Sequence, residues 1–563
     1  MRQPAPAIAI ATALLALALL PGAVARPAEL PRLDRSGPVP QLIVDGEPWI
    51  ALGGEVHNST ASDMAWMAPL WGRFADAHLN TLVTPVYWEL LEPTEGHYDY
   101  ALVDEQLRQA KQHSLHLVLL WFGTLKNASS SYAPDWVLAD RARFPRAATR
   151  AAPGLLTKDE PVLSVFGRAT LEADARAFTM LMRHLAVADP EHVVIAVQVE
   201  NETGLLGDSR DRSPAAEHAW REPVPVQLMA SLARRRGQLD PSLAALWKQH
   251  GERPNGGWSE VFGDDWQGEE IFMAWAVGHY VDTVAAAGKS ALALPMYANA
   301  WLGPQSAGDR AGAYPSGGPV PRVFDAWKAA APHLDWLSPD IYVDDFAGWA
   351  AAYSHDGNPL FVPESRFIAG NVFTAIGDLH ALGISVFGIE DGVPGNQLAE
   401  VYGLLRPLLP QIARAQRADG VRGFALAPQE VRELALGDYR IEVRGQREYL
   451  AQALRDMGIP LPANPPERVA QNRGTGMPEL ADARPAGLLL QLSSSEFLLV
   501  GRDLHIGFRL AKPPGERVEV ARFEEGRYVD GRWVAGRVLN GDERLAVLPQ
   551  DGYGSVRIRL LGR

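Results

Sequence analysis

Two glutamates in this chain stand where apolar segments end, and together they suit a reaction that needs two carboxyl groups. The apolar run Val193–Val199 leads into Glu202, and a second apolar run, Leu360–Val362, leads into Glu364. Hydrolysis of a glycosidic bond uses one carboxyl group to protonate the leaving oxygen and another to attack or stabilise the anomeric carbon. We therefore take Glu202 as the candidate general acid/base and Glu364 as the candidate nucleophile.

Each glutamate also has a plainer interpretation. Along a regular strand Glu200 and Glu202 point the same way and Asn201 points the other way. A bulge or a strand end must therefore break the alternation before Asn201 and Glu202 can face one substrate; otherwise the segment is a charged loop. Arg366 could lower the pKa of the Glu364 carboxyl and keep it ionised, or the two could form a surface ion pair.

Other acids compete for these roles. Glu390 follows the last apolar run of the first 400 residues and is the main rival for the nucleophile. Glu55, Glu89 and Glu92 follow the first two runs and receive no role from the sequence.

Eight short apolar runs alternate with helix-like segments between about residues 40 and 415. This order predicts an α/β fold, a (β/α)8 barrel with its site at the carboxyl ends of the strands. An open doubly wound sheet is the alternative, although no Gly-rich phosphate loop follows any run. The predicted strands are Trp49–Leu52, Thr81–Pro85, His116–Leu120, Val193–Val199, Ala291–Pro295, Trp336–Ser338, Leu360–Val362 and Ile384–Gly388. The predicted helices include Asp63–His78, Ala101–His113, Leu171–Ala188 and Glu270–Ala287.

Two further regions accompany the barrel. Residues 203–269, after the fourth strand, are polar and are expected to elaborate the substrate face. Residues 416–563 predict a small antiparallel, β-sandwich-like domain, with an irregular linker at about 450–485. Asp530-Gly531 and Asn540-Gly541 are signals for two-residue hairpins within it.

The first 25 residues have the pattern of a signal peptide. Arg2 precedes the apolar run Ala7–Leu20, and Ala23–Ala25 fits a small-x-small cleavage site. We expect cleavage after Ala25, no membrane insertion afterwards, and a periplasmic or secreted protein. An uncleaved membrane anchor is the alternative, but the run is shorter than the ~20 residues of a spanning helix.

Composition excludes several other functions. The formal net charge of −14 argues against a nucleic-acid partner, whereas a neutral carbohydrate raises no conflict. The chain has no Cys, which excludes disulfides, thiol nucleophiles and thiolate metal sites. His57, His97 and His250 have no partner at ligand spacing, so we expect neither a metal nor a cofactor. The sequence does not indicate an oligomeric state.

The barrel resembles glycoside hydrolase family 35, mostly β-galactosidases of clan A. Gln198–Gly204 is similar to that family's Gln-Val-Glu-Asn-Glu-Tyr-Gly motif, in which the last Glu is the acid/base and the Asn binds the sugar 2-hydroxyl. Trp88–Pro93 looks like its Trp-Asn-x-His-Glu-Pro segment, and Gly53–His57 looks like its first-strand Gly-x-x-His. The resemblance implies removal of terminal β-D-galactosyl residues by double displacement, with acid/base and nucleophile on strands 4 and 7 and no cofactor.

The chain also departs from the family pattern. Thr203 stands where Tyr is usual, Glu89 replaces Asn, Leu91 replaces His, and Phe122–Asn127 lacks the family's Gly-Pro-Tyr and acidic residue. These departures resemble a bacterial branch with one C-terminal β domain that is linked to plant cell-wall galactosides such as xyloglucan side chains. Another clan A β-glycosidase, an endo-glycanase of the mannanase or glucanase type, and a non-catalytic carbohydrate-binding barrel remain alternatives.

Six further residues complete the predicted substrate site. Asn201 is expected to hold the 2-hydroxyl, and Tyr342 is expected to orient the nucleophile. The first candidates for sugar contacts are Asn58, Trp88, Asn127 and Trp301, each of which could instead pack in the core or cap a loop.

Overall fold

The barrel and its C-terminal domain are seen in a computed structural model of the chain. The structure describes residues 29–129, 131–150, 162–355, 357–392, 394–459, 482–512, 516–529 and 531–561. The predicted signal peptide lies outside the described residues. In the described part of the chain, no helix is both long and apolar enough to cross a membrane.

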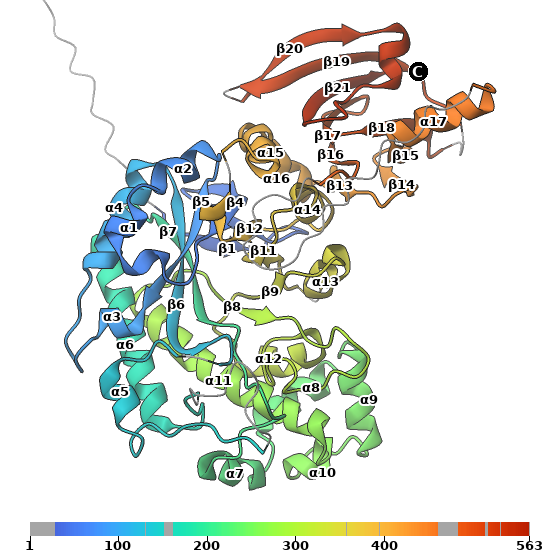
Figure 1. Ribbon diagram of the computed structural model, residues 1–563. Helices are drawn as coiled ribbons and strands as arrows, with labels where there is room; N and C mark the ends of the chain where they lie inside the picture. Colours follow the sequence, from blue (N-terminus) through green and yellow to red (C-terminus); the bar gives the residue numbers. More distant parts are fainter. Residues whose placement is uncertain are drawn as a thin grey trace, which may run out of the picture.

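A parallel sheet closes on itself to form the barrel (Figure 1). The seventh barrel strand is divided at Pro363, which has no N–H to donate. Its first half pairs with the eighth strand and its second half with the sixth, and this closes the sheet. The strands are β4 (Ala51–Glu55), β5 (Thr81–Tyr87), β6 (His116–Lys126), β7 (Val194–Asn201), β8 (Met296–Trp301), β9 (Trp336–Ile341), β10 (Phe361–Val362), β11 (Glu364–Ser365) and β12 (Gly383–Phe387). The predicted fold class is confirmed.

Helices surround the sheet with one apolar stripe facing inward. In α4, the buried residues Val103, Gln106, Leu107 and Ala110 recur every three or four positions, as one face of a helix requires. The surrounding helices are α1 (Met64–Met67), α2 (Trp71–Asp76), α3 (Trp88–Leu91), α4 (Ala101–Gln112), α5 (Asp135–Ala139), α6 (Arg168–Ala188), α11 (Trp266–Ala291), α12 (Phe324–Ala330), α13 (Phe346–Tyr353), α14 (Ala369–Phe373), α15 (Gln397–Leu405) and α16 (Leu409–Arg417).

Two predicted elements of the barrel are wrong in their bounds. Ala291–Pro295 is not the fifth strand, because α11 continues to Ala291 and β8 begins at Met296. Asp63–His78 is not one helix, because Asp63 caps the short α1 and a second helix, α2, starts at Trp71.

The segment after β7 forms one end of the molecule. It folds into α7 (Pro214–Arg221), α8 (Val226–Arg234), α9 (Pro241–Gln249) and α10 (Trp258–Phe262). A buried ion cluster ties its start to α11: Arg212 Nη1 lies 2.6 Å from Glu269 Oε1, and Arg212 Nη2 lies 2.9 Å from Asp208 Oδ1.

The C-terminal region is a sandwich of two antiparallel sheets. A six-stranded sheet has the order β13-β16-β17-β21-β19-β20, and β14-β15-β18 form the second sheet. Their bounds are β13 (Val421–Ala425), β14 (Val431–Leu436), β15 (Tyr439–Gly445), β16 (Ala486–Gln491), β17 (Glu496–Arg502), β18 (Leu504–Leu510), β19 (Val520–Val529), β20 (Arg532–Leu539) and β21 (Gly554–Leu560). A third small sheet, β1 (Arg32–Asp34), β2 (Gln41–Val44) and β3 (Glu47–Trp49), precedes the barrel.

Three local predictions in this region had different outcomes. The first hairpin signal is confirmed, since Val529 pairs with Arg532 and Gly531 has a φ of +70°. The second is wrong, because Gly541 starts a 3-10 helix and β20 has no partner on that side. A helix, α17 (Gln446–Asp456), occupies the start of the expected irregular linker, and residues 460–481 lie outside the described residues.

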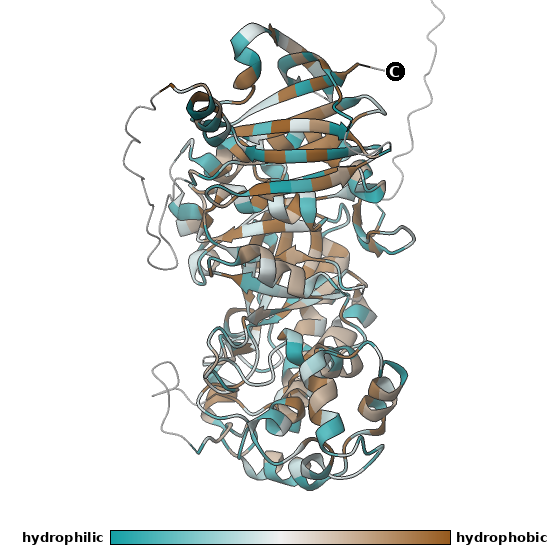
Figure 2. Ribbon diagram, turned by 90° about the vertical axis from the view of Figure 1, so that its right-hand side faces the viewer, coloured by the Kyte–Doolittle hydropathy of each residue, from teal (hydrophilic) through white to brown (hydrophobic). Residues whose placement is uncertain are grey.

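Strand alternation joins the barrel to the sandwich. On β16 and β17, Leu488, Leu490, Leu498 and Val500 belong to the apolar core that continues into the barrel. The alternate residues Leu489 and Phe497 belong to a second core between the two sheets. Figure 2 shows hydrophobic residues in brown along the strands of the C-terminal sheets. The six-stranded sheet is therefore buried on both faces along its inner strands.

Candidate active site

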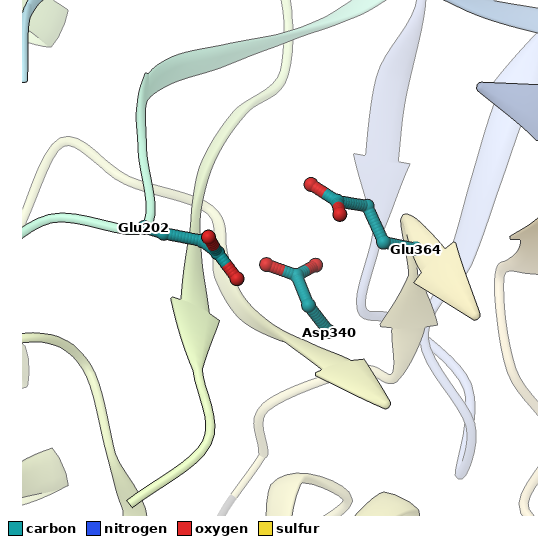
Figure 3. Close-up of side chains that lie close together, drawn as sticks. All are labelled: Glu202, Asp340 and Glu364. Atoms are coloured by element: carbon teal, nitrogen blue, oxygen red, sulfur yellow. The ribbon is translucent and has the colours of Figure 1, made fainter. Parts of the chain in front are cut away.

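Three carboxyl groups converge at the carboxyl end of the barrel strands. One oxygen each from Glu202, Asp340 and Glu364 lies within 4.8 Å of the others, and Figure 3 shows their side chains pointing toward one another. Their exposed fractions are 7%, 2% and 5%. The two glutamates predicted from the sequence therefore share one buried site.

An irregular backbone at the end of β7 brings Glu202 into this site. Glu200 has a φ of +63° and Glu202 a φ of +43°, both in the left-handed region that L-residues rarely adopt. The alternation of a regular strand is therefore broken, as the sequence analysis required. Asn201 and Glu202 both reach the carboxyl cluster, whereas Glu200 bonds to the backbone at the end of β6.

The surroundings of Glu202 keep a proton on it near neutral pH. Burial is the larger cause and the nearby Glu364 carboxylate the second, and together they raise the pKa of Glu202 from 4.5 to about 7. Lys126 and the side-chain amide of Asn127, which donates to Glu202 Oε2, oppose this rise. A carboxyl group with such a pKa suits a general acid.

Glu364 accepts hydrogen bonds that hold its carboxylate in place. The Tyr342 hydroxyl donates to Oε2 at 2.5 Å, and Asn201 Nδ2 donates to Oε1 at 3.3 Å. Lys126 Nζ in turn donates to Asn201 Oδ1 at 2.7 Å. Tyr342 thus contacts Glu364, as the sequence analysis expected, and Asn201 contacts it as well, while the role of Asn201 toward the sugar 2-hydroxyl stays a prediction.

Asp340, on β9, is a member of the cluster that the sequence analysis missed. Its Oδ2 accepts a hydrogen bond from Asn299 Nδ2 at 2.6 Å, and Asn299 Oδ1 accepts from the Glu202 backbone N–H at 2.9 Å. Burial, and then the charge of Glu364, raise the pKa of Asp340 well above its usual range. A signal was present in the sequence, since Asp340 ends an apolar strand as the two glutamates do.

A fourth acid lies beneath the cluster. Glu55, at the end of β4, has 0% exposure, and neither of its carboxyl oxygens has a hydrogen-bond partner in the described residues. Burial, and then the charge of Glu364, raise the pKa of Glu55 well above its usual range. These surroundings therefore favour the protonated form of Glu55.

The four residues predicted to contact the sugar differ in how close they lie to the carboxyl cluster. Asn127 reaches Glu202, and the buried Oδ1 of Asn58 accepts no hydrogen bond within the described ranges. Trp301, half-buried, ends β8 and pairs in register with Asp340. Trp88 is fully buried and donates its indole N–H to Glu92 at 2.9 Å. These contacts show that it packs in the core, and its predicted contact with a sugar stays a prediction.

Glu390, the alternative candidate for the nucleophile, accepts hydrogen bonds from the loop after β4. Glu390 Oε1 accepts the His57 backbone N–H at 2.8 Å and the Thr60 hydroxyl at 2.5 Å, which fastens the loop after β4. Arg366 pairs with Asp344 at 2.8 Å. Within the described residues Arg366 therefore pairs with Asp344, and it does not form the ion pair with Glu364 that the sequence suggested.

The same three carboxyl groups are the one acidic cluster with ligand spacing that the described residues contain. Oxygen ligands of this kind suit hard divalent cations. All three carboxyl groups, however, already accept hydrogen bonds: Glu202 from Asn127, Glu364 from Tyr342 and Asn201, and Asp340 from Asn299. These hydrogen bonds orient the Glu202 and Glu364 carboxyl groups, and such an arrangement can serve as a general acid/base and a nucleophile at one glycosidic bond.

Comparisons with known proteins describe two parts of the chain. A family model described as "Domain of unknown function (DUF5597)" matches residues 398–548. A β-galactosidase from Xanthomonas manihotis is 29% identical over 205 residues, which make up 35% of this chain and 31% of that protein. The chain therefore matches about a third of that relative's length.

Among solved structures, two β-galactosidases show a distant likeness. One, from Bacillus circulans sp. alkalophilus, is 16% identical with a TM-score of 0.43, covering 65% of this chain and 57% of the other. The other, a catalytic mutant of a GH42 β-galactosidase from G. stearothermophilus, is 10% identical with a TM-score of 0.45, covering 91% of this chain and 99% of the other.

Proposed function

We propose that this chain is a retaining glycoside hydrolase that removes terminal β-D-galactosyl residues from oligo- or polysaccharides. One observation carries the proposal: Glu202 and Glu364 present carboxyl oxygens within 4.8 Å of each other in one buried site. Retaining enzymes place their two carboxyl groups about 5–5.5 Å apart, whereas inverting enzymes leave about 6.5–9.5 Å for a water molecule.

In the first step, the protonated Glu202 transfers its proton to the glycosidic oxygen while the Glu364 carboxylate attacks the anomeric carbon. The bond from that carbon to the leaving oxygen breaks as the bond to Glu364 forms. In the second step, the Glu202 carboxylate takes a proton from water, and the water oxygen displaces Glu364. Asn201, which accepts a hydrogen bond from Lys126, is proposed to donate to the sugar 2-hydroxyl in both steps.

The choice of galactose rests on the resemblance to family 35 and on the relative from Xanthomonas manihotis, whose name is β-galactosidase. Plant cell-wall galactosides are the proposed natural substrates on the same resemblance. Export to the periplasm or the medium is proposed from the sequence of residues 1–25 alone. Other partners are not proposed.

A panel of nitrophenyl β-glycosides tests the reaction and the sugar together. We expect turnover of the β-galactoside and little turnover of the glucoside, mannoside or xyloside. Cleavage of a glucan or mannan with no turnover of the small substrates would support an endo-glycanase instead. Sugar binding without turnover of any substrate would support a non-catalytic barrel.

The E202A variant tests the role of the acid. It should lose far more activity on an unactivated galactoside than on one with a good leaving group, because only the poor leaving group needs protonation. Azide should restore turnover and give a β-galactosyl azide, since it can attack without a base. Full activity of E202A on the unactivated galactoside would reject Glu202 as the acid/base.

A further inference from the structure

A buried carboxyl group lies behind the site and takes no part in the proposed chemistry. Glu200 has 0% exposure and stands two positions before Glu202 on β7. Its φ of +63° turns its side chain away from the carboxyl cluster and toward the end of β6. A non-glycine residue in this conformation costs free energy, and such strain is retained where the surroundings enforce it.

The Glu200 carboxyl group accepts hydrogen bonds from two backbone N–H groups that do not pair within the sheet. Oε2 accepts the Leu125 N–H at 2.6 Å and Oε1 accepts the Thr124 N–H at 3.2 Å. The pairing of β6 with β7 is irregular here, because Trp121 faces Val199 and the next paired residue is Lys126, opposite Asn201. The N–H groups of Thr124 and Leu125 therefore bond to the Glu200 side chain and not to β7.

A second buried acid fixes Glu200 in turn. Asp174 on α6 is fully buried and hydrogen-bonds to the Glu200 carboxyl. Burial, and then the charge of Asp174, raise the pKa of Glu200 well above its usual range. Asp174 also accepts the Trp121 indole N–H at 2.8 Å and the Tyr280 hydroxyl at 2.9 Å.

The chain leaves room for this network at one position. A Cβ atom on Gly123 would lie 2.5 Å from Trp121 Nε1 and 2.6 Å from Glu200 Oε1, closer than any carbon can approach them. Glycine at position 123 therefore lets the carboxyl group reach the backbone of Thr124 and Leu125.

The segment held by Glu200 continues directly into two groups of the active site. Lys126 donates to Asn201, and Asn127 donates to Glu202. Asn127 and Ala128 both have positive φ, +52° and +50°, so this end of β6 is held in an unfavourable conformation. A shift of Thr124 and Leu125 would be passed to both donors within two residues.

We infer that Glu200 is a positioning residue: by binding the backbone N–H groups of Thr124 and Leu125, it places Lys126 and Asn127 against Asn201 and Glu202. The inference rests on the proposed function for the role of Glu202, and it gives the first glutamate of the Glu-Asn-Glu segment a task distinct from that of the second.

The test compares E200A with E200Q. In E200A the segment loses its anchor, and we expect roughly a 10- to 100-fold loss of kcat on an unactivated galactoside, with a smaller loss on an activated one. Because Lys126 and Asn127 both lower the pKa of Glu202, their displacement should raise it. The alkaline limb of the kcat/KM profile should then move to higher pH. E200Q keeps a donor toward Asp174 and an acceptor for Leu125, so it should restore the wild-type limb.

Two further measurements do not depend on turnover. Hydrogen exchange of the Thr124 and Leu125 amides should be faster in E200A, and the Leu125 amide should remain slow in E200Q, which keeps its acceptor. Carboxyl NMR should place the pKa of Glu202 higher in E200A. A wild-type enzyme that turns over no glycoside would reject the proposed function, whereas exchange and NMR would still decide the role of Glu200.

Control variants separate positioning from loss of stability. D325A removes another buried acid, which accepts Arg235 Nε at 3.1 Å and the Asp240 N–H at 2.9 Å far from the site, and it should lower Tm while leaving the pH profile unchanged. E200D withdraws the carboxyl by one methylene and serves if E200A does not fold; it should give the same direction of shift. An unmoved limb, equal losses on both substrates and unchanged amide exchange in the folded variant would overturn the inference.

Discussion

Tyr342 directly follows β9, the strand that pairs with β11, and its hydroxyl donates a hydrogen bond to Glu364 Oε2 at 2.5 Å. Hydrogen bonds to a charged group contribute about 1.5–3 kcal/mol. Y342F should therefore lower kcat/KM for a galactoside roughly 10- to 100-fold without unfolding the protein.

Y353F is the matched control for this variant. The buried Tyr353 donates to the Pro319 carbonyl at 3.0 Å outside the carboxyl cluster, so its loss should affect Tm more than kcat/KM. Equal kinetics for Y342F and Y353F would show that Tyr342 does not support the nucleophile.

The pH dependence of activity follows from Glu202. Its pKa is raised to about 7, and a general acid acts in its protonated form, so kcat/KM should fall as the pH rises through about 7. In E364Q the repulsion from Glu364 is gone, and NMR of the inactive variant should find the Glu202 pKa lower than in wild type. An unchanged or higher value would contradict the proposed coupling between the two carboxyl groups.

The same pKa makes stability depend on pH. Glu202 holds its proton more tightly in the folded protein than in the unfolded chain, where the ordinary value is 4.5. The folded state is therefore disfavoured as pH rises from about 4.5 through about 7, by up to about 3 kcal/mol.

The variant E202Q removes this titration. The Tm of E202Q minus the Tm of wild type should increase from pH 5 to pH 8. The control variant E433Q, at an exposed position, should show no such trend. A constant difference between E202Q and wild type across this range would contradict the raised pKa.

Asp340 is expected to act as a neutral group. Because its pKa is raised well above the usual range, D340N resembles the protonated acid and can keep the contact with Asn299. D340N should retain most activity with an unmoved alkaline limb, while D340A should lose activity. A limb shifted to lower pH in D340N would show that Asp340 carries a charge that raises the pKa of Glu202.

Sequence patterns predicted the elements where one physical signal dominates. Buried parallel strands are continuous apolar runs, and seven of the eight were placed within a few residues of their observed bounds. The fifth was misplaced because the Ala-rich chain before Met296 is apolar both as the end of α11 and as a strand. Periodicity cannot distinguish the two in so short a run.

The site was predicted in part for a related reason. Glu202 and Glu364 follow strands and match a known motif, so their meeting could be predicted. The positive φ of Glu200, the irregular pairing at the end of β6 and the burial of Asp340 and Glu55 arise from tertiary packing. Local sequence carries no signal for such backbone features or for the burial of one particular acid. Glu200, Glu55 and Asp340 therefore received no role, although Asp340 follows an apolar run as Glu202 and Glu364 do.

Covalent trapping tests the central claim most directly. Incubation with an activated 2-deoxy-2-fluoro-β-galactoside, followed by proteolysis and mass spectrometry, should find one fluorogalactosyl group on the peptide that contains Glu364, with the ester at that residue. E202Q should not move the label to another residue. A label on Glu390, Asp340 or any residue other than Glu364 would contradict the account.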